Sequence, residues 1–159
     1  MVQRVMVLLI IAVLMATLDQ FSKLTVMSML SPGDQVPLIP GLLSLVYWKN
    51  PGASFGLLGD LTYARWILAG VTLLAFILIV WFAKGPLGKR PFFLLCLGLV
   101  FGGALGNLFD RLNLGWVVDF ILVYYQDWYW PAFNLADCAI TMGGLFAAIY
   151  FWRNAPDNK

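Results

Sequence analysis

The sequence predicts a mainly α-helical integral membrane protein, with four transmembrane helices, a small extracytoplasmic β-sheet (a cradle) and an interfacial loop. Of its 159 residues, 62% are hydrophobic and 11% are charged, and the mean hydropathy is +0.85. A soluble globule of this size needs more polar surface than that. A net charge of +2 without a dense basic run excludes a nucleic-acid partner. No linker or internal repeat interrupts the sequence, so residues 1–159 are expected to form a single domain.

Four apolar stretches approach the roughly 20 residues that a helix needs to cross a bilayer. The first runs from Val2 to Leu18 and continues as a mixed helix to Met29, and the others are about Ala64 to Ala83, Phe92 to Phe109 and Leu135 to Trp152. An even number of spans places both termini on one side. The first stretch is interpreted as a retained anchor, because no A-x-A-like cleavage site follows it.

Basic residues indicate the orientation of these spans. They cluster at the N-terminus, in the short turn between spans two and three, and at the C-terminus: Arg4, Lys84, Lys89, Arg90, Arg153 and Lys159. The positive-inside rule places these segments in the cytoplasm. The two long connections, residues 31–63 and 112–133, are then extracytoplasmic.

Both long connections contain segments typical of short strands. Residues 36–48 and 116–133 are rich in β-branched and aromatic side chains, which favour strands. Their Trp and Tyr residues are also typical of an interfacial aromatic belt. A small sheet that rests on the outer membrane surface satisfies both interpretations.

Polar residues converge at the extracytoplasmic end of the predicted bundle. The first span leaves the membrane at Asp19 and Lys23, the third at residues 107–111, and the fourth enters it at residues 134–137. A charged side chain at membrane depth costs roughly 2.5–3.5 kcal/mol, so such residues usually pair, line a wet cavity or do chemistry.

The third span carries two stripes. Gly98, Gly102 and Gly106 recur every four residues, a pattern that lets helix backbones approach closely. A second stripe presents an amide, a carboxylate and a guanidinium on one face: Gly103, Asn107, Asp110 and Arg111. The alternative for the last two residues is that they anchor the helix at the interface.

Two other polar groups also have a purely structural interpretation. Asp19 and Lys23 stand four residues apart and could neutralise each other. Asn134 and Asp137 could cap the fourth helix, as N-cap and N3 residues. Ser22 points about a quarter turn away from Lys23, which excludes a Ser/Lys nucleophile pair.

Asp119 interrupts an otherwise apolar strand-like run, where a carboxylate is costly unless it has a partner. Asp137 is a suitable partner. All eight acidic residues are Asp and the chain has no His, so acid/base chemistry falls to Asp, and two Cys without His leave no usual zinc site. Two close carboxylates share one proton and offer an acid and a base together. These parts are those of an aspartyl hydrolase at a membrane surface.

Five motifs carry a resemblance to a known family. In chain order they are Asp19-x-x-x-Lys23, Asn50-Pro-Gly-Ala-Ser-Phe-Gly56, Gly102-Gly-Ala-Leu-Gly-Asn-Leu-Phe-Asp-Arg111, Val117-Val-Asp-Phe120 and Phe133-Asn-Leu-Ala-Asp137. In this order the sequence resembles the lipoprotein signal peptidases (signal peptidase II), and the motifs span almost the whole chain.

The resemblance implies a bacterial inner-membrane aspartyl endopeptidase without a metal or other cofactor. It would cut the signal peptide of diacylglyceryl-modified prolipoproteins immediately before the lipobox cysteine, and globomycin would inhibit it. The resemblance makes Asp119 and Asp137 the catalytic dyad. The implied supporting or substrate-binding residues are Asp19, Lys23, Asn50, Gly103, Asn107, Arg111 and Asn134. Membrane lipids are expected partners, and the segment from Asn50 to Gly56 is expected to be a mobile lid over the dyad.

Two other classes of protein remain as alternatives. A small transporter or ion-conducting oligomer would need polar residues through the full membrane thickness, and the second and fourth spans offer the inner half almost none. An assembly factor with a structural charge network would not cleave a lipidated precursor. Cleavage therefore separates that class from an enzyme.

Overall fold

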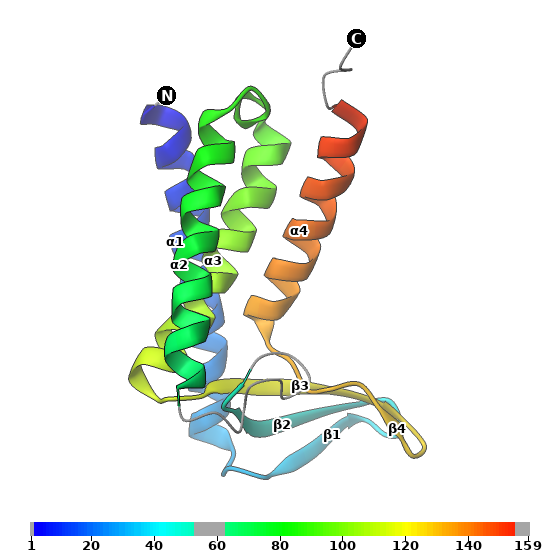
Figure 1. Ribbon diagram of the computed structural model, residues 1–159. Helices are drawn as coiled ribbons and strands as arrows, with labels where there is room; N and C mark the ends of the chain where they lie inside the picture. Colours follow the sequence, from blue (N-terminus) through cyan, green and yellow to red (C-terminus); the bar gives the residue numbers. More distant parts are fainter. Residues whose placement is uncertain (1, 53–62, 155–159) are drawn as a thin grey trace.

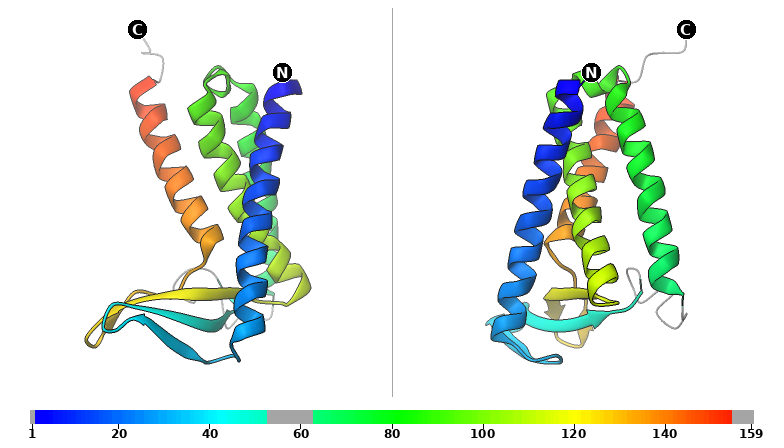
Figure 2. Two further views of the ribbon diagram at one scale, coloured as in Figure 1. Left: turned by 180° about the vertical axis from the view of Figure 1, so that it is seen from behind. Right: turned by 90° about the vertical axis from the view of Figure 1, so that its left-hand side faces the viewer.

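The computed structural model describes residues 2–52 and 63–154 (Figure 1). Its long helices are α1 (Val2–Met29), α2 (Ala64–Lys84), α3 (Pro91–Asn113) and α4 (Leu135–Asn154), with a short 3₁₀ helix, η2, at Leu87–Lys89. All four long helices are sufficiently long and apolar to cross a membrane, which confirms the predicted spans. The start of α1 and the end of α4 lie at the same end of the bundle (Figure 2), as an even number of spans requires.

Helix α3 is the central helix of the bundle. In its most apolar stretch 56% of the residues are buried within the protein, against 17% for each of the other three helices. The glycine stripe predicted on α3 packs against α1, where a β-carbon on Gly102 would lie 2.6 Å from the carbonyl oxygen of Ala12. Gly103 faces α4 instead, and a β-carbon there would lie 2.5 Å from the carbonyl oxygen of Ala136. Glycine therefore lets two helices approach α3 closely.

An antiparallel sheet lies across the other end of the helices (Figures 1 and 2). Its strands are β1 (Gln35–Ile39), β2 (Leu43–Asn50), β3 (Val117–Tyr125) and β4 (Trp128–Tyr129), in the order β1-β2-β3-β4. The predicted strand segments are confirmed, but β2 extends to Asn50, beyond the expected end at 48. In the β2–β3 register Asn50 pairs with Val117 and Trp48 with Asp119. Asn50 and Asp119 are therefore diagonal neighbours on one face of the sheet.

The two ends of the bundle have different interiors. Where α1 begins, the buried cluster is apolar and contains Leu8, Ile79, Ala83, Phe93, Leu94 and Leu97. Toward the sheet, the buried residues include charged and amide side chains: Asp19, Lys23, Asn107, Asp110, Asp119 and Asn134. The fold thus brings together polar residues from α1, α3, β3 and the start of α4, at the end that the sequence predicts.

Candidate active site

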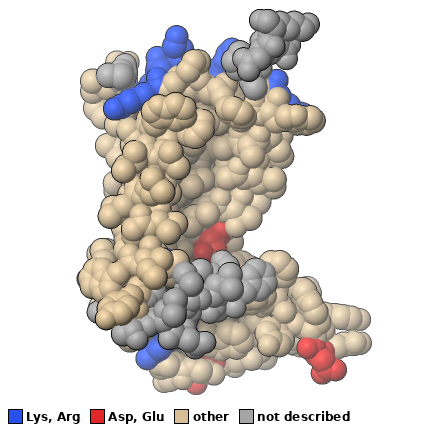
Figure 3. Space-filling model, viewed as in Figure 1, with Lys and Arg blue, Asp and Glu red and all other residues tan. Residues whose placement is uncertain are grey.

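A cavity of about 570 Å³ opens between α2 and α4, above the sheet. Figure 3 shows a hollow in this region with acidic atoms at its floor. Asp119 of β3 and Asp137 of α4 both line the cavity, and α3 forms its back wall through Asn107 and Arg111. Most of the remaining wall is apolar, including Ala104, Ile140 and Met142. The apolar wall suits a hydrophobic ligand, and the two carboxylates provide polar groups at one end of the cavity.

Asp119 is the more deeply buried of the two carboxylates. It is 4% exposed, and its two oxygens accept hydrogen bonds from Asn50 Nδ2 at 2.9 Å and from Asn134 Nδ2 at 2.8 Å. Burial raises the pKa of Asp119 to about 7, and repulsion from Asp137 acts in the same direction, whereas the two amide donors oppose the rise. The carboxyl group of Asp119 therefore holds its proton at higher pH than an ordinary aspartate does.

Asp137 lies in the first turn of α4 and forms a reciprocal cap with Asn134. Its backbone N–H donates to Asn134 Oδ1 at 3.0 Å, and the backbone N–H of Asn134 donates to Asp137 Oδ2 at 3.1 Å. The capping interpretation is therefore confirmed, yet both side chains also face the cavity residues. The side chain of Asp137 is thereby held at the N-terminus of α4, within reach of the cavity.

Three asparagines direct their NH₂ groups at the two carboxylates. The oxygen of Asn107 accepts from Lys23 Nζ at 2.9 Å. Because an ammonium can only donate, the NH₂ group of Asn107 must point the other way, and it donates to Asp137 Oδ1 at 2.9 Å. Asn50 and Asn134 are oriented in the same manner, because their oxygens accept the backbone N–H groups of Gly52 and Asp137. Each amide orientation is thus fixed by a donor on its far side.

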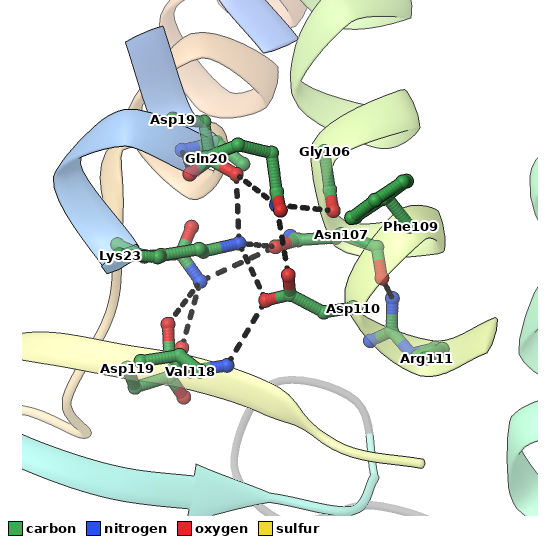
Figure 4. Close-up of polar contacts among 12 residues, drawn as sticks. Asp19, Gln20, Lys23, Gly106, Asn107, Phe109, Asp110, Arg111, Val118 and Asp119 are labelled. Atoms are coloured by element: carbon green, nitrogen blue, oxygen red, sulfur yellow. Dashed lines mark hydrogen bonds and ion pairs between the residues drawn. The ribbon is translucent and has the colours of Figure 1, made fainter. Parts of the chain in front are cut away.

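Lys23 lies at the centre of a buried charge network (Figure 4). Its ammonium group is 2.8 Å from Asp19 Oδ2 and 2.9 Å from Asp110 Oδ2, and all three side chains are at most 3% exposed. The predicted Asp19–Lys23 pair is confirmed, but Lys23 also forms an ion pair with Asp110. Its third hydrogen bond, to Asn107, connects the charges to the cavity.

Arg111 and Asp110, predicted to share one stripe, turn to different sides of α3. Arg111 lines the cavity and donates from Nη2 to the carbonyl oxygen of Gly52 at 3.1 Å. Its Nε is buried without a hydrogen-bond partner among the described residues. Asp110 turns to α1 instead and contacts Gln20 and Lys23. The prediction of a single polar face was therefore wrong for Asp110. Helix α1 packs so closely on α3 that Asp110 forms its side-chain contacts with α1 and not with the cavity.

Two residues of this region were missed as site residues by sequence reasoning. Asp110 belongs to the quoted motif, but its only sequence signal was an ambiguous stripe position. Gln20 gave no signal, since one glutamine beside a membrane span has no characteristic pattern.

Of the predicted lid, only Asn50 to Gly52 belongs to the described residues, and the rest of that prediction lies outside them. Within 2–52 and 63–154, no group of three or more His, Cys, Asp or Glu residues could hold a metal ion.

Comparison with known proteins identifies the family. The profile of the family described as signal peptidase (SPase) II matches residues 11–153. A lipoprotein signal peptidase of Pseudomonas aeruginosa (strain UCBPP-PA14) is 45% identical over 147 residues, which cover 91% of this chain and 86% of the relative. A lipoprotein signal peptidase of Symbiobacterium thermophilum is 38% identical over 138 residues, covering 87% and 89%.

Solved structures agree with these sequence matches. A bacterial membrane enzyme solved by the in meso method at 2.3 Å resolution superposes with a TM-score of 0.83 at 30% identity, over 96% of this chain and 92% of that one. A second such enzyme, solved at 1.9 Å, gives a TM-score of 0.81 at 30% identity. The chain therefore belongs to the signal peptidase II family of aspartic peptidases, which cleave the signal peptides of lipoproteins.

Proposed function

We propose that the protein hydrolyses the signal peptide of diacylglyceryl-modified prolipoproteins immediately N-terminal to the lipobox cysteine, with Asp119 and Asp137 as the catalytic dyad. The observation that carries this proposal is the pair of carboxylates at the floor of one largely apolar cavity. The carboxylates have different environments, because one is buried in a strand and the other lies in the first turn of a helix. Carboxylates whose environments differ in this manner can divide the roles of acid and base.

In the proposed reaction Asp119 is protonated and Asp137 is ionised at the start. Asp137 takes a proton from water as the water oxygen attacks the scissile carbonyl carbon, and Asp119 gives its proton to the carbonyl oxygen. The tetrahedral diol then collapses: the C–N bond breaks, Asp137 gives its proton to the leaving amine of the cysteine, and a diol hydroxyl returns a proton to Asp119. The elevated pKa of Asp119 supports its role as the acid, and Asp137 is assigned the role of base because it is the other carboxylate that lines the cavity.

The cavity wall suits a substrate that remains in the membrane. The cavity lies between α2 and α4, with Thr72 on one side and Ile140, Thr141 and Met142 on the other. A signal-peptide helix and a diacylglyceryl group are both apolar, so they could enter between the two helices without leaving the lipid. Arg111 also lines this cavity, and a guanidinium group can donate to a substrate carbonyl oxygen. Globomycin, the inhibitor that the family resemblance implies, would compete for the same space.

The orientation follows from the charges at the two ends. Lys84, Lys89 and Arg90 are exposed beside the α2–α3 turn, and most of the visible Lys and Arg atoms gather at that end (Figure 3). We infer that this end is cytoplasmic and that the sheet faces outward from the bacterial inner membrane. Lys49→Cys and Lys89→Cys, in a protein without Cys96 and Cys138, test this. An impermeant thiol reagent should label position 49 and not position 89 in intact cells, and the reverse pattern would contradict the orientation.

The dyad is tested with Asp119→Asn and Asp137→Asn, because Asn keeps the shape but cannot transfer the proton. The purified variants and the wild-type protein would be incubated with a synthetic precursor that carries an S-diacylglyceryl cysteine, and the products identified by mass spectrometry. Cleavage before the cysteine should be lost in both variants and kept in Asp127→Asn, which changes an exposed acid in the β3–β4 turn. Near wild-type turnover in either dyad variant would remove that residue from the mechanism.

A further inference from the structure

Two further carboxylates are buried next to the proposed dyad without lining the cavity. Asp19 on α1 is 0% exposed and Asp110 on α3 is 2% exposed. Neither is among the cavity-lining residues, so neither side chain would contact a substrate bound in the cavity. Burial of a carboxylate costs several kcal/mol unless good partners compensate it. The partners of these two groups therefore indicate what they do.

Asp110 holds the backbone immediately before Asp119. Its Oδ2 accepts a hydrogen bond from the backbone N–H of Val118 at 3.1 Å, drawn in Figure 4. The carbonyl oxygen of Val118 in turn accepts from Asn134 Nδ2 at 3.2 Å. Side chains thus fix both backbone polar groups of the residue that precedes Asp119, which limits the movement of the strand at this point.

Asp19 makes the equivalent contact on the other side of the dyad. Its Oδ1 accepts a hydrogen bond from the backbone N–H of Ala136 at 2.9 Å, and Ala136 immediately precedes Asp137. Lys23 links these two carboxylates, because its ammonium group contacts Asp19 Oδ2 at 2.8 Å and Asp110 Oδ2 at 2.9 Å. One buried cation therefore connects the two carboxylates that hold the backbone beside each member of the dyad.

Gln20 completes the surroundings of Asp110. Its Nε2 donates to Asp110 Oδ1 at 2.8 Å and to the carbonyl oxygen of Gly106 at 3.2 Å. Both oxygens of Asp110 thus face donors, namely Gln20 on one side and Lys23 with Val118 on the other. An amide at position 110 would have to direct its NH₂ group at one of these donors, since only one end of an amide accepts.

We propose that Asp110, held by Gln20 and Lys23, is a positioning residue that together with Asp19 sets the relative placement of the two catalytic aspartates. The proposal rests on the dyad proposed above. Misplacement of reacting groups by about 1 Å can lower a rate by about 100-fold, whereas none of these four side chains lines the cavity. Disturbing the network therefore lowers kcat and leaves KM largely unchanged.

The test is a charge-exchange cycle of Asp110→Asn, Gln20→Glu and the double variant. In Asp110→Asn the amide NH₂ faces Gln20, and in Gln20→Glu two carboxylates face each other across the 2.8 Å contact. In the double variant the amide of residue 110 can donate to the carboxylate of residue 20, while its oxygen still accepts from Val118 and Lys23. We expect each single variant to lose about 100-fold in kcat and the double variant to recover at least about tenfold of that loss.

The wild-type protein and Asp127→Asn serve as controls, and thermal unfolding in detergent reports the folded fraction of each variant. If Asp110→Asn does not fold, Gln20→Leu removes one donor without changing any charge, and a kcat loss of about tenfold in folded protein is expected. Unchanged kcat per folded molecule in the single variants, or a double variant as slow as either single variant, would overturn the positioning role. If the wild-type protein itself failed to cleave the lipidated precursor, the proposed function would fail instead.

Discussion

At the end of the bundle where α1 begins, the helices are joined by apolar side chains, whereas near the sheet they are joined by charged ones. Leu8, Phe93 and Leu94 fill the first region, and Asp19, Lys23 and Asp110 fill the second. Apolar packing is non-directional, so it stabilises a bundle without fixing particular atoms. Hydrogen-bonded charges are costly to bury but directional, so they can hold backbone groups at set positions. The comparison teaches that both ends contribute to stability, whereas only the charged end sets the geometry of the proposed catalytic groups.

The largest effect is expected from Lys23→Met, which removes the only cation among the side chains that contact Asp19 and Asp110 in the described part of the chain. Two carboxylates then remain buried without a counter-charge, and breaking a buried ion pair in this manner costs about 3–5 kcal/mol. Cleavage should fall to background and the thermal midpoint in detergent should drop markedly. A folded Lys23→Met protein with wild-type activity would show that the charge network does not support the site.

Asn107→Ala should have the next largest effect on rate. It removes the NH₂ group that donates to Asp137 and the oxygen that accepts from Lys23. Loss of one donor in a catalytic site typically lowers kcat about 100-fold or more. Asn113→Ala on the same helix is the matched control, because Asn113 is exposed and donates only to the carbonyl oxygen of Phe109 in the hydrogen bonds of the described residues. Equal rates for the two variants would place Asn107 outside the catalytic arrangement.

Gly103→Ala should lower the rate less than Asn107→Ala does, by increasing the distance between α3 and α4. A β-carbon at Gly103 would lie 2.5 Å from the carbonyl oxygen of Ala136 and 3.0 Å from Ile140, so α4 must shift next to Asp137. A loss of about tenfold in kcat is expected, less than for a full 1 Å displacement. At Gly144 a β-carbon would meet no atom within 4 Å, so Gly144→Ala should keep full activity. A Gly103→Ala enzyme as fast as the control would show that this close approach does not matter.

The smallest effect on rate is expected from Leu94→Ala at the apolar end. Leu94 is 5% exposed, and loss of a buried leucine costs about 2–5 kcal/mol. The thermal midpoint should therefore fall, while kcat per folded molecule stays near the wild-type value because the dyad is at the other end. A kcat loss as large as that of Asn107→Ala would mean that the apolar end also sets the catalytic geometry, which contradicts the account.

The helices and strands were predictable because their signals are local. An apolar stretch of sufficient length or a β-branched run specifies its own element, so only the ends differ, as with β2, which continues to Asn50. The gathering of polar residues at one end of the bundle was also predictable, since Asp119 and Asn107 are polar groups in apolar surroundings.

The contacts between elements could not be predicted in the same way. Asp110 turns toward α1 because glycines bring α1 and α3 together, and at Gly106 a β-carbon would collide with the carboxylate of Asp19. That arrangement depends on the distance between two helices far apart in the sequence. The hydrogen bonds from the backbone of Val118 and Ala136 to buried carboxylates depend on it too, and no sequence pattern reports the partner of a backbone N–H group.

The central claim, that Asp119 supplies the proton of the dyad, is tested most directly by the pH dependence of kcat/KM on the lipidated precursor. Because burial raises the pKa of Asp119 to about 7 and the protonated form is the active one, the rate should fall as pH rises through about 7. In Asn50→Ala the midpoint of this fall should move to higher pH, since Asn50 donates to the Asp119 carboxylate and stabilises its ionised form. A rate that keeps rising above pH 8, or a midpoint that does not move in Asn50→Ala, would contradict the assignment.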